Sequence, residues 1–344
     1  MSTQVGDVPR VRTTLSARDR LGTIRARWGL RRMNYRVEAG LYAVGNPGSE
    51  SPVLVTASYK LSFDRLRSVL SHRDAWILVL DTKGINVWCA AGKGTFGTDE
   101  LVRRVQMSGL AQIVSHRKLV VPQLGATGVS AHMVRKLCGF HVTYGPVRAE
   151  DLPAFWDAGM KAQPEMRRVR FNLRDRTVLI PVELVMGMKY ALLAVAVVVL
   201  LSGLYSHGYS FALVRTTGMR SAALVLGAFL TGAILGPALL PWLPGRAFSL
   251  KGAALGLLLF GATAFFGWFA TISAHSALHI AAWALIVPTI TSFTVMNFTG
   301  ASTYTSLSGV LREMRFAVPA QISGAVIGLG LWVASLFLSG GQVQ

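Results

Sequence analysis

The second half of the chain is almost free of charged side chains, and this feature limits the possible folds more than any other. Between residues 190 and 311 the sequence carries only four charges, all basic: Arg215, Arg220, Arg246 and Lys251. A soluble domain of this length needs a charged surface, whereas a helix that crosses a bilayer needs about 20 mostly apolar residues. The sequence therefore predicts a polar first half followed by a membrane half.

Five apolar runs in the membrane half are long enough to span a bilayer. They lie at about residues 189–206, 221–243, 250–273, 277–297 and 317–338. Basic residues, Arg176 and Lys251 among them, gather in the 161–189 flank and in two loops on the same predicted side. Because Lys and Arg mark the cytoplasmic side, we expect a multi-pass protein of the cytoplasmic (inner) membrane whose polar half faces the cytoplasm.

The polar half divides into three parts. Residues 1–34 predict a basic, poorly ordered N-terminal arm, and the first 36 residues contain nine Arg. Residues 35–160 alternate strand-like and helix-like patterns, which favours an α/β doubly wound (Rossmann-like) domain. Residues 161–188 form a basic juxtamembrane linker. The expected fold class is thus an α/β domain followed by an all-α transmembrane domain of five helices over residues 189–344.

A large planar ligand would suit one edge of the predicted sheet. Ligands of doubly wound sheets bind at the carboxyl ends of the strands. Those ends are rich in Gly and other small residues, and they correspond to residues 81–97, 122–130 and 144–148.

Two phosphate-binding motifs are excluded in the first of these segments. Gly92, Gly94 and Gly97 satisfy the G-x-G-x-x-G pattern, but Gly92 lies eleven residues beyond the strand-ending Asp81. The dinucleotide fingerprint follows its strand directly. A P-loop fails because Gly94, and not Ser or Thr, follows Lys93.

The remaining octapeptide, Asn86-Val-Trp-Cys-Ala-Ala-Gly-Lys93, resembles the cap-helix signature of the mercury-methylating corrinoid proteins. The flanking segments 122–132 and 139–151 resemble the large subunit of the corrinoid iron–sulfur protein, and this broader similarity covers about residues 40–160. The five-span tail is similar to the mercury-methylation family. The resemblance implies a corrinoid-dependent methyltransferase with a cobalamin-type cofactor that contains cobalt.

Cys89 takes the position of the family Cys that serves as the lower axial ligand of cobalt. It is therefore the predicted catalytic residue and metal ligand. A thiolate is a soft, strongly donating ligand, and the axial ligand is a main influence on a macrocyclic metal. Donation by sulfur would favour release of the upper methyl group as a carbanion equivalent, which the electrophile Hg(II) can accept.

The resemblance also implies contacts along the cap helix. Val87 and Trp88 are expected to anchor the helix, and Ala90, Ala91 and Gly92 are expected to let it approach the ring. The turn glycines beside the helix either contact the cofactor or only shape the turn. The predicted cofactor-binding residues are Asn86, Val87, Trp88, Cys89, Ala90, Ala91, Gly92, Lys93, Gly125, Thr127, Gly128 and Gly145.

The leading hypothesis is methyl transfer from cobalt to Hg(II), which forms methylmercury, with a methylated folate as the methyl donor. Two separated cysteines cannot hold an iron–sulfur cluster. The resemblance therefore points to a ferredoxin-like partner with two [4Fe-4S] clusters as the reductant. A carrier with another methyl acceptor remains an alternative. A transporter with a regulatory soluble domain is a further one, against which the absence of acids within the spans argues.

Three further features leave choices open. The basic charge alone would suit nucleic acid, but no nucleic-acid-binding motif occurs and none is expected as a partner. His275 and His279 are spaced to bind a metal on one helix face, although packing is the favoured interpretation. The hydroxyl-rich run 297–306 either satisfies backbone groups or receives substrate.

Overall fold

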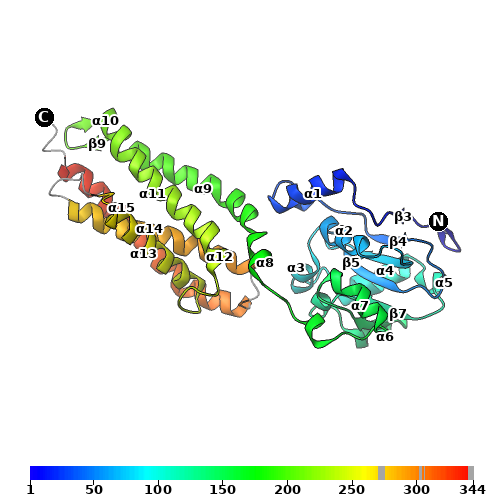
Figure 1. The fold of residues 1–344 in the computed structure, drawn as a ribbon. Coiled ribbons are helices and arrows are strands. Elements are labelled where there is room, and N and C mark those ends of the chain that lie inside the picture. Colours follow the sequence, from blue (N-terminus) through cyan, green and yellow to red (C-terminus); the bar gives the residue numbers. More distant parts are fainter. Residues whose placement is uncertain (270–275, 302–303, 306, 340–344) are drawn as a thin grey trace. The chain divides into compact units, whose positions relative to one another are not determined.

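The computed structural model describes residues 1–269, 276–301, 304–305 and 307–339. The chain divides into two compact units, Met1–Val169 and Arg170–Gln344. The first is an α/β unit with a mostly parallel sheet, and the second is mainly helical (Figure 1). This arrangement confirms the predicted fold class.

The α/β unit is built on a six-stranded sheet with the order β3-β4-β6-β5-β7-β8. Strands β5 to β8 run parallel, whereas β4, which the sequence analysis missed, pairs antiparallel with β6. The strands are β3 (Arg10–Val11), β4 (Gly40–Val44), β5 (Val53–Ala57), β6 (Ala75–Leu80), β7 (Lys118–Val121) and β8 (His141–Tyr144).

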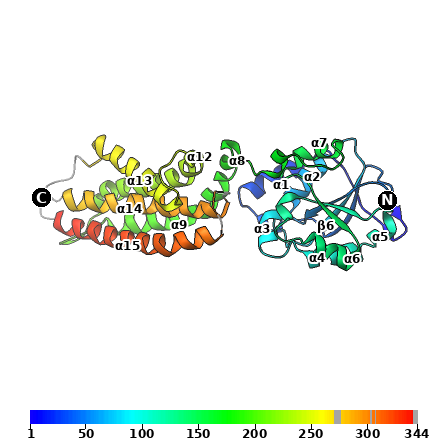
Figure 2. The same cartoon turned by 90° about the horizontal axis from the view of Figure 1, so that it is seen from below.

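Helices cover both faces of this sheet, so the central strands are apolar throughout. Trp76, Leu78 and Leu80 of β6 point into one core, and Ile77 and Val79 point into the other. Figure 2 shows α2 and α7 on one face and α3, α4 and α6 on the opposite face. The helices are α2 (Lys60–Ser68), α3 (Val87–Gly92), α4 (Thr98–Met107), α5 (Leu110–Ile113), α6 (Ala131–Cys138) and α7 (Leu152–Asp157).

The N-terminal segment contains regular structure, so the expectation of a poorly ordered arm is wrong there. The strands β1 (Ser2–Thr3) and β2 (Gly6–Asp7) form a hairpin, and β3 joins the main sheet. Helix α1 (Ala17–Arg27) begins with a capping box in which Ser16 and Asp19 satisfy each other's backbone N–H groups. These local bonds stabilise the start of a helix whose sequence is polar and rich in arginine.

Among its described residues, the helical unit contains five helices or helix runs that are long and apolar enough to cross a membrane, as predicted. They are Leu173–Leu201, Phe211–Leu239, Phe248–Phe265, Ala277–Asn297 and Ser308–Leu338. The elements are α8 (Leu173–Thr177), α9 (Ile180–Leu201), β9 (Leu204–Tyr205), β10 (Gly208–Tyr209), α10 (Phe211–Leu213), α11 (Met219–Leu230), α12 (Gly236–Leu239), α13 (Phe248–Phe265), α14 (Ser276–Asn297) and α15 (Leu307–Ser339), with π-helical turns at Val214–Gly218 and Thr231–Leu235.

The first, second and last spans begin earlier than predicted. Pro181 stands in the first turn of α9, where its fixed φ favours helix initiation and its missing N–H is harmless. Glu183 therefore lies inside a candidate span, and Glu313 lies inside another, α15. The expectation of acid-free spans is wrong. The carboxylate of Glu313 accepts a hydrogen bond from the Ser249 backbone N–H (2.6 Å) at the start of α13.

Two basic residues counted as orientation markers are buried in the helical unit. Arg176 donates to the carbonyl oxygens of Pro237 (2.9 Å) and Ala238 (3.2 Å). Lys251 donates to the carbonyl oxygens of Leu240 (3.0 Å) and Leu243 (2.5 Å). Both cations therefore satisfy carbonyl groups at the carboxyl end of α12, where the helix dipole favours positive charge.

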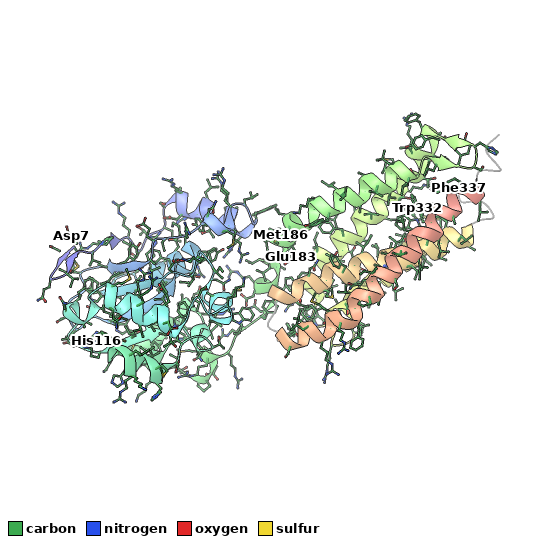
Figure 3. The ribbon with its side chains drawn as sticks, turned by 180° about the vertical axis from the view of Figure 1, so that it is seen from behind. Asp7, His116, Glu183, Met186, Trp332 and Phe337 are labelled. Carbon is green, nitrogen blue, oxygen red and sulfur yellow. The ribbon has the colours of Figure 1, made fainter. Side chains whose placement is uncertain are left out.

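A buried aromatic cluster joins α14 and α15. Trp283 and Trp332 are fully buried with ring centroids 6.4 Å apart, and Figure 3 labels Trp332 on α15. The indole of Trp283 donates to His279 Nε2 (3.1 Å), and His279 Nδ1 lies 3.2 Å from the Ser335 hydroxyl. Both ring nitrogens have protein partners, which favours the packing interpretation of His279. His275 lies outside the described residues.

Candidate functional site

The parallel strands bring the loops after β6, β7 and β8 to one edge of the sheet. These loops are the glycine-rich segments 81–97, 122–130 and 144–148 that the sequence analysis singled out. Helix α3, which carries the octapeptide, therefore lies at the ligand-binding edge of a doubly wound sheet.

The loop that leads into α3 is fixed by two buried hydroxyl groups. The backbone N–H groups of Thr82 and Gly84 both donate to the Ser58 hydroxyl (3.2 Å each). The Thr82 hydroxyl accepts from the Ser58 N–H (3.2 Å) and donates to the Ile85 carbonyl (2.6 Å). Sequence reasoning missed Ser58 and Thr82, although they lie one and two residues after β5 and β6, respectively. Together they set the position at which α3 begins.

Charges next to this loop are paired. Lys83 donates to the Asp81 carboxylate through its backbone N–H (3.1 Å) and its ammonium group (2.6 Å). These bonds lower the pKa of Asp81 in spite of the opposing effect of partial burial. The Asp81 N–H in turn donates to Glu100 of α4 (2.9 Å). The carboxylate of Asp81 is thus ionised and engaged in shaping the loop.

Both ends of α3 are defined by its own residues. The Asn86 side chain caps the helix by accepting the Cys89 backbone N–H (2.9 Å). At the other end the Lys93 N–H donates to the Cys89 carbonyl (3.1 Å), and Gly94 follows with a φ of 80°. A helix of only six residues cannot persist alone in water, so these bonds and its tertiary contacts hold it.

The outer face of α3 presents Cys89 to solvent. Trp88, Cys89, Gly92 and Lys93 are exposed on this face. Added to Gly92, a Cβ atom would meet nothing within 4 Å. No protein atoms therefore cover the surface at Gly92 beside the thiol, and Cys89 is accessible to a ligand. We name these four residues the α3 platform.

The inner face of α3 differs from the expectation in one respect. Ala90 and Ala91 are buried, so their small side chains allow close packing on the protein and do not face a ring. Val87 is 8% exposed and packs against the core, whereas Trp88 is 39% exposed and only partly covered by the protein. Tertiary contacts determine which side of so short a helix is buried, and the sequence pattern alone does not supply those contacts.

Gly125 and Gly128 have a packing role that explains why glycine stands there. A Cβ atom on Gly128 would lie 2.2 Å from the Phe96 carbonyl oxygen and 3.0 Å from Ala91 Cα. A Cβ atom on Gly125 would lie 2.5 Å from the Phe96 ring, which is fully buried. These two glycines, predicted as cofactor contacts or turn residues, thus allow the loop after β7 to support α3. Phe96 is a further residue that sequence reasoning missed.

A cavity of about 340 Å³ lies beside α3 at the same edge of the sheet. It brings together Asn86, Val87 and Trp88 with Gly145, which were all predicted site residues. Other predicted site residues do not line this cavity: Cys89, Gly92, Lys93, Gly125, Thr127 and Gly128. Thr127 is exposed elsewhere on its loop. Arg65 and Arg148 are part of the lining. The site therefore has two adjoining parts, the open platform and this cavity.

A second cavity, of about 820 Å³, lies within the helical unit. Glu183 and Met186 of α9, both labelled in Figure 3, line it together with Asn297 and Gln321. Gln321 donates to the Ser292 hydroxyl (2.8 Å), but its buried Oε1 has no hydrogen-bond partner among the described residues. Of the hydroxyl-rich run 297–306, Thr303 lies outside the described part of the chain.

Comparison with known proteins shows that the α/β unit is similar in sequence to subunits of certain enzyme complexes. Residues 28–155 match the family model described as CO dehydrogenase/acetyl-CoA synthase delta subunit. The acetyl-CoA decarbonylase/synthase complex subunit gamma of Methanopyrus kandleri is 32% identical over 121 residues, which cover 35% of this chain and 26% of that protein. The same subunit of Methanocaldococcus jannaschii is 33% identical over 93 residues, covering 26% and 19%.

The chain thus spans about a quarter or less of the length of these relatives. The match includes α3 and the loops after β6, β7 and β8, and it ends before the helical unit. It supports the predicted similarity of this region to the large subunit of the corrinoid iron–sulfur protein. The similarity to mercury-methylating proteins, which rests on the octapeptide and the helical tail, stays a prediction.

Proposed function

We propose that the α3 platform binds a corrinoid and that the chain is a membrane-anchored methyltransferase that passes a methyl group to Hg(II). The observation that carries this proposal is the Cys89 thiol. It stands exposed on a helix whose two ends are fixed, at the ligand-binding edge of the sheet, inside the region that matches the family model.

The residues present suit such a cofactor. A Cβ atom on Gly92 would meet no protein atom within 4 Å and the thiol of Cys89 is exposed, so both are open to an approaching ligand. The adjoining cavity is within the usual range of ligand pockets, about 300–1,000 Å³. Arg65 and Arg148 bring positive charge to its lining, which would favour an anionic appendage of the ring system, although the guanidinium group of Arg65 is also paired with Glu150.

When bound, a corrinoid supplies a cobalt centre that can accept a methyl group and release it to an acceptor. Cys89 would hold the cobalt through its sulfur, and a thiolate donates electron density strongly to a metal. The Asn86 cap fixes the backbone of Cys89 and so restricts where the sulfur can lie. The ammonium group of Lys93, exposed on the same platform, would meet polar side chains at the ring edge.

The test compares the full-length protein with its Cys89→Ala variant. The wild type is expected to bind cobalt with the visible absorbance of a corrinoid and to form methylmercury, whereas the variant loses methylmercury formation. Cys138→Ala is the matched control, because the Cys138 thiol only donates to the Val134 carbonyl of its own helix (3.2 Å). Methylmercury formation by Cys89→Ala at the wild-type rate would exclude the cobalt–thiolate mechanism.

Partners and location follow as parts of the same proposal. The chain has two cysteines, too few for an iron–sulfur cluster, so a ferredoxin-like protein with two [4Fe-4S] clusters would supply electrons. A methylated folate would supply the methyl group. The basic residues before the first span favour an inner-membrane protein with its α/β unit in the cytoplasm.

Two observations favour alternatives that deserve a direct test. The matched relatives are subunits of acetyl-CoA decarbonylase/synthase complexes, which favours a carrier with a different methyl acceptor. Competition between Hg(II) and a thiol acceptor in purified membranes separates these functions. The second cavity, with Glu183 and the unsatisfied Gln321, favours transport. Uptake of Hg(II) into proteoliposomes, compared with Gln321→Leu, tests that role.

A further inference from the structure

Helix α1 is attached to the α/β unit by one face only. Asp19 receives hydrogen bonds from the ammonium group of Lys60 (2.6 Å) and the guanidinium group of Arg67 (3.0 Å), both on α2. Ala26, two turns further along the same face, is fully buried. A Cβ atom on Gly22 would lie 2.5 Å from the Tyr35 ring. These contacts fix the rotation of α1, so the side chains of its opposite face are known.

That opposite face carries an apolar ridge. At 3.6 residues per turn, Leu21, Ile24 and Trp28 align along the side of α1 that faces away from Asp19 and Ala26. All three are about half exposed, between 46% and 54%. Leu30 and Met33 extend the exposed apolar surface just beyond the helix. Large apolar side chains that gather on one exposed helix face mark an interaction surface.

Arginines border this ridge on both sides. By the same helical spacing, Arg18 and Arg25 lie along one side of the ridge and Arg20 and Arg27 along the other, and all four are exposed. The one acid of the helix, Asp19, is turned toward α2. The outer face of α1 is therefore an apolar strip between two rows of positive charge. Figures 1 and 2 both show α1 beside α2.

A lipid surface fits this pattern better than a protein or nucleic acid. Helices that lie in the bilayer interface carry Trp and Leu on one side and basic residues on the polar flanks. Arginine stems can cover apolar surface while the guanidinium groups reach the phosphates. The same chain carries candidate membrane spans, and a bilayer crossed by them would raise the effective concentration of lipid for the α/β unit.

We propose that the outer face of α1 binds the anionic lipid surface of the membrane that anchors the chain. Leu21, Ile24 and Trp28 insert among the headgroups, and the four flanking arginines pair with lipid phosphates. The α/β unit is thereby held at the bilayer by a second attachment besides the helical spans. The proposal needs no bound corrinoid and is independent of the methyl-transfer function.

The experiment uses the full chain in lipid nanodiscs with a photo-cross-linking residue on the ridge. Ile24→benzoylphenylalanine is illuminated in nanodiscs of pure phosphatidylcholine and in nanodiscs with one part in four phosphatidylglycerol. Mass spectrometry counts lipid adducts. Leu137→benzoylphenylalanine is the matched control, because Leu137 is a similarly exposed apolar residue, on α6.

We expect lipid adducts at position 24 but few at position 137, and more adducts at position 24 with the anionic lipid. Each basic residue near an anionic membrane surface changes the equilibrium between the bound and unbound states of a segment about fivefold. Arg20→Gln combined with Arg27→Gln should therefore lower the yield strongly, as should high salt. Unchanged thermal unfolding of this double variant shows that α1 remains docked through Asp19.

Equal adduct yields at positions 24 and 137 would overturn the proposal, as would a yield at position 24 that ignores lipid charge. Adducts to an added acidic ferredoxin-like protein in place of lipid would also overturn it and assign this face to a protein partner.

Discussion

Two single-methyl substitutions separate the folding role of the site from its ligand role. Gly128→Ala places a Cβ atom 2.2 Å from the Phe96 carbonyl oxygen and 3.0 Å from Ala91 Cα, both backbone atoms that cannot rotate away. Such overpacking costs about 1–3 kcal/mol, which corresponds to roughly 2–12 °C in the unfolding temperature of a domain of this size. Gly128→Ala is therefore expected to destabilise the α/β unit.

Gly92→Ala is expected to have the opposite effect on stability. Its Cβ atom meets nothing within 4 Å and its backbone is helical, so the substitution removes the entropic cost of a helical glycine. The gain is about 0.5 kcal/mol, or roughly 1–2 °C. The same methyl group would stand on the α3 platform. If a corrinoid lies there, its affinity should fall by about tenfold, equivalent to about 1.4 kcal/mol.

The assay measures both properties on the full-length apo-protein. Temperature-dependent proteolysis, read as the survival of peptides from residues 1–169, reports the stability of the α/β unit. Absorbance titration with a corrinoid reports affinity. A Gly92→Ala variant that binds corrinoid as tightly as the wild type would refute the assignment of the α3 platform. A Gly128→Ala variant with unchanged stability would refute the packing argument.

Three further predictions concern packing and charge. In the helical unit, a Cβ atom on Gly256 would lie 2.4 Å from Pro288 Cα. Gly256→Ala should therefore lower the thermal stability in detergent by about 1–3 kcal/mol. The control Gly261→Ala should not lower it, because a Cβ atom on Gly261 meets nothing within 4 Å. Arg176→Met should destabilise the same unit by about 1.5–3 kcal/mol, because it removes charged hydrogen bonds to buried carbonyl groups; the same assay checks it, and an unchanged unfolding temperature would contradict the role of Arg176. Burial alone would raise the pKa of Asp19, but the hydrogen bonds from Lys60 and other donors hold it well below its ordinary value of 3.8. The docking of α1 should therefore be fully stable above about pH 5 and weaken progressively as the pH falls below it. Hydrogen exchange of residues 17–27 should show no such acid-dependent weakening in Asp19→Asn.

Much of the fold follows from local patterns. Continuous apolar runs predicted β5, β6 and β7, because strands buried on both faces exclude polar residues. The edge strand β8, His141–Tyr144, was expected from its position between a helix pattern and the Gly145-Pro146 turn. Strand β4 was missed since its short sequence, Gly40–Val44, becomes a strand only through pairing with the distant β6. Helix α1 was missed because arginines hide its periodicity. Its one clear signal was the S-x-x-D spacing of Ser16 and Asp19.

The site was predictable in location and less so in orientation. The sequence predicted that the octapeptide and the strand ends share one edge of the sheet, and the structure brings these segments together there. Which face of α3 is buried depends on Gly128, Phe96 and the sheet, which the six-residue pattern does not contain. The approach to a ring expected for Ala90 was wrong for this reason, because Ala90 is fully buried. The direction in which Cys89 points likewise required the three-dimensional structure.

The fixing of α3 at both ends has a consequence for how a ligand would arrive. Asn86, the Ser58–Thr82 pair and the glycine-supported loop order the helix without any ligand. The conformational entropy of arranging the platform is therefore lost during folding of the chain and not during ligand association. Association should then proceed at a rate set by diffusion and orientation, with no slow rearrangement phase. A newly made apo-protein would be ready to accept its cofactor as soon as the sheet has formed.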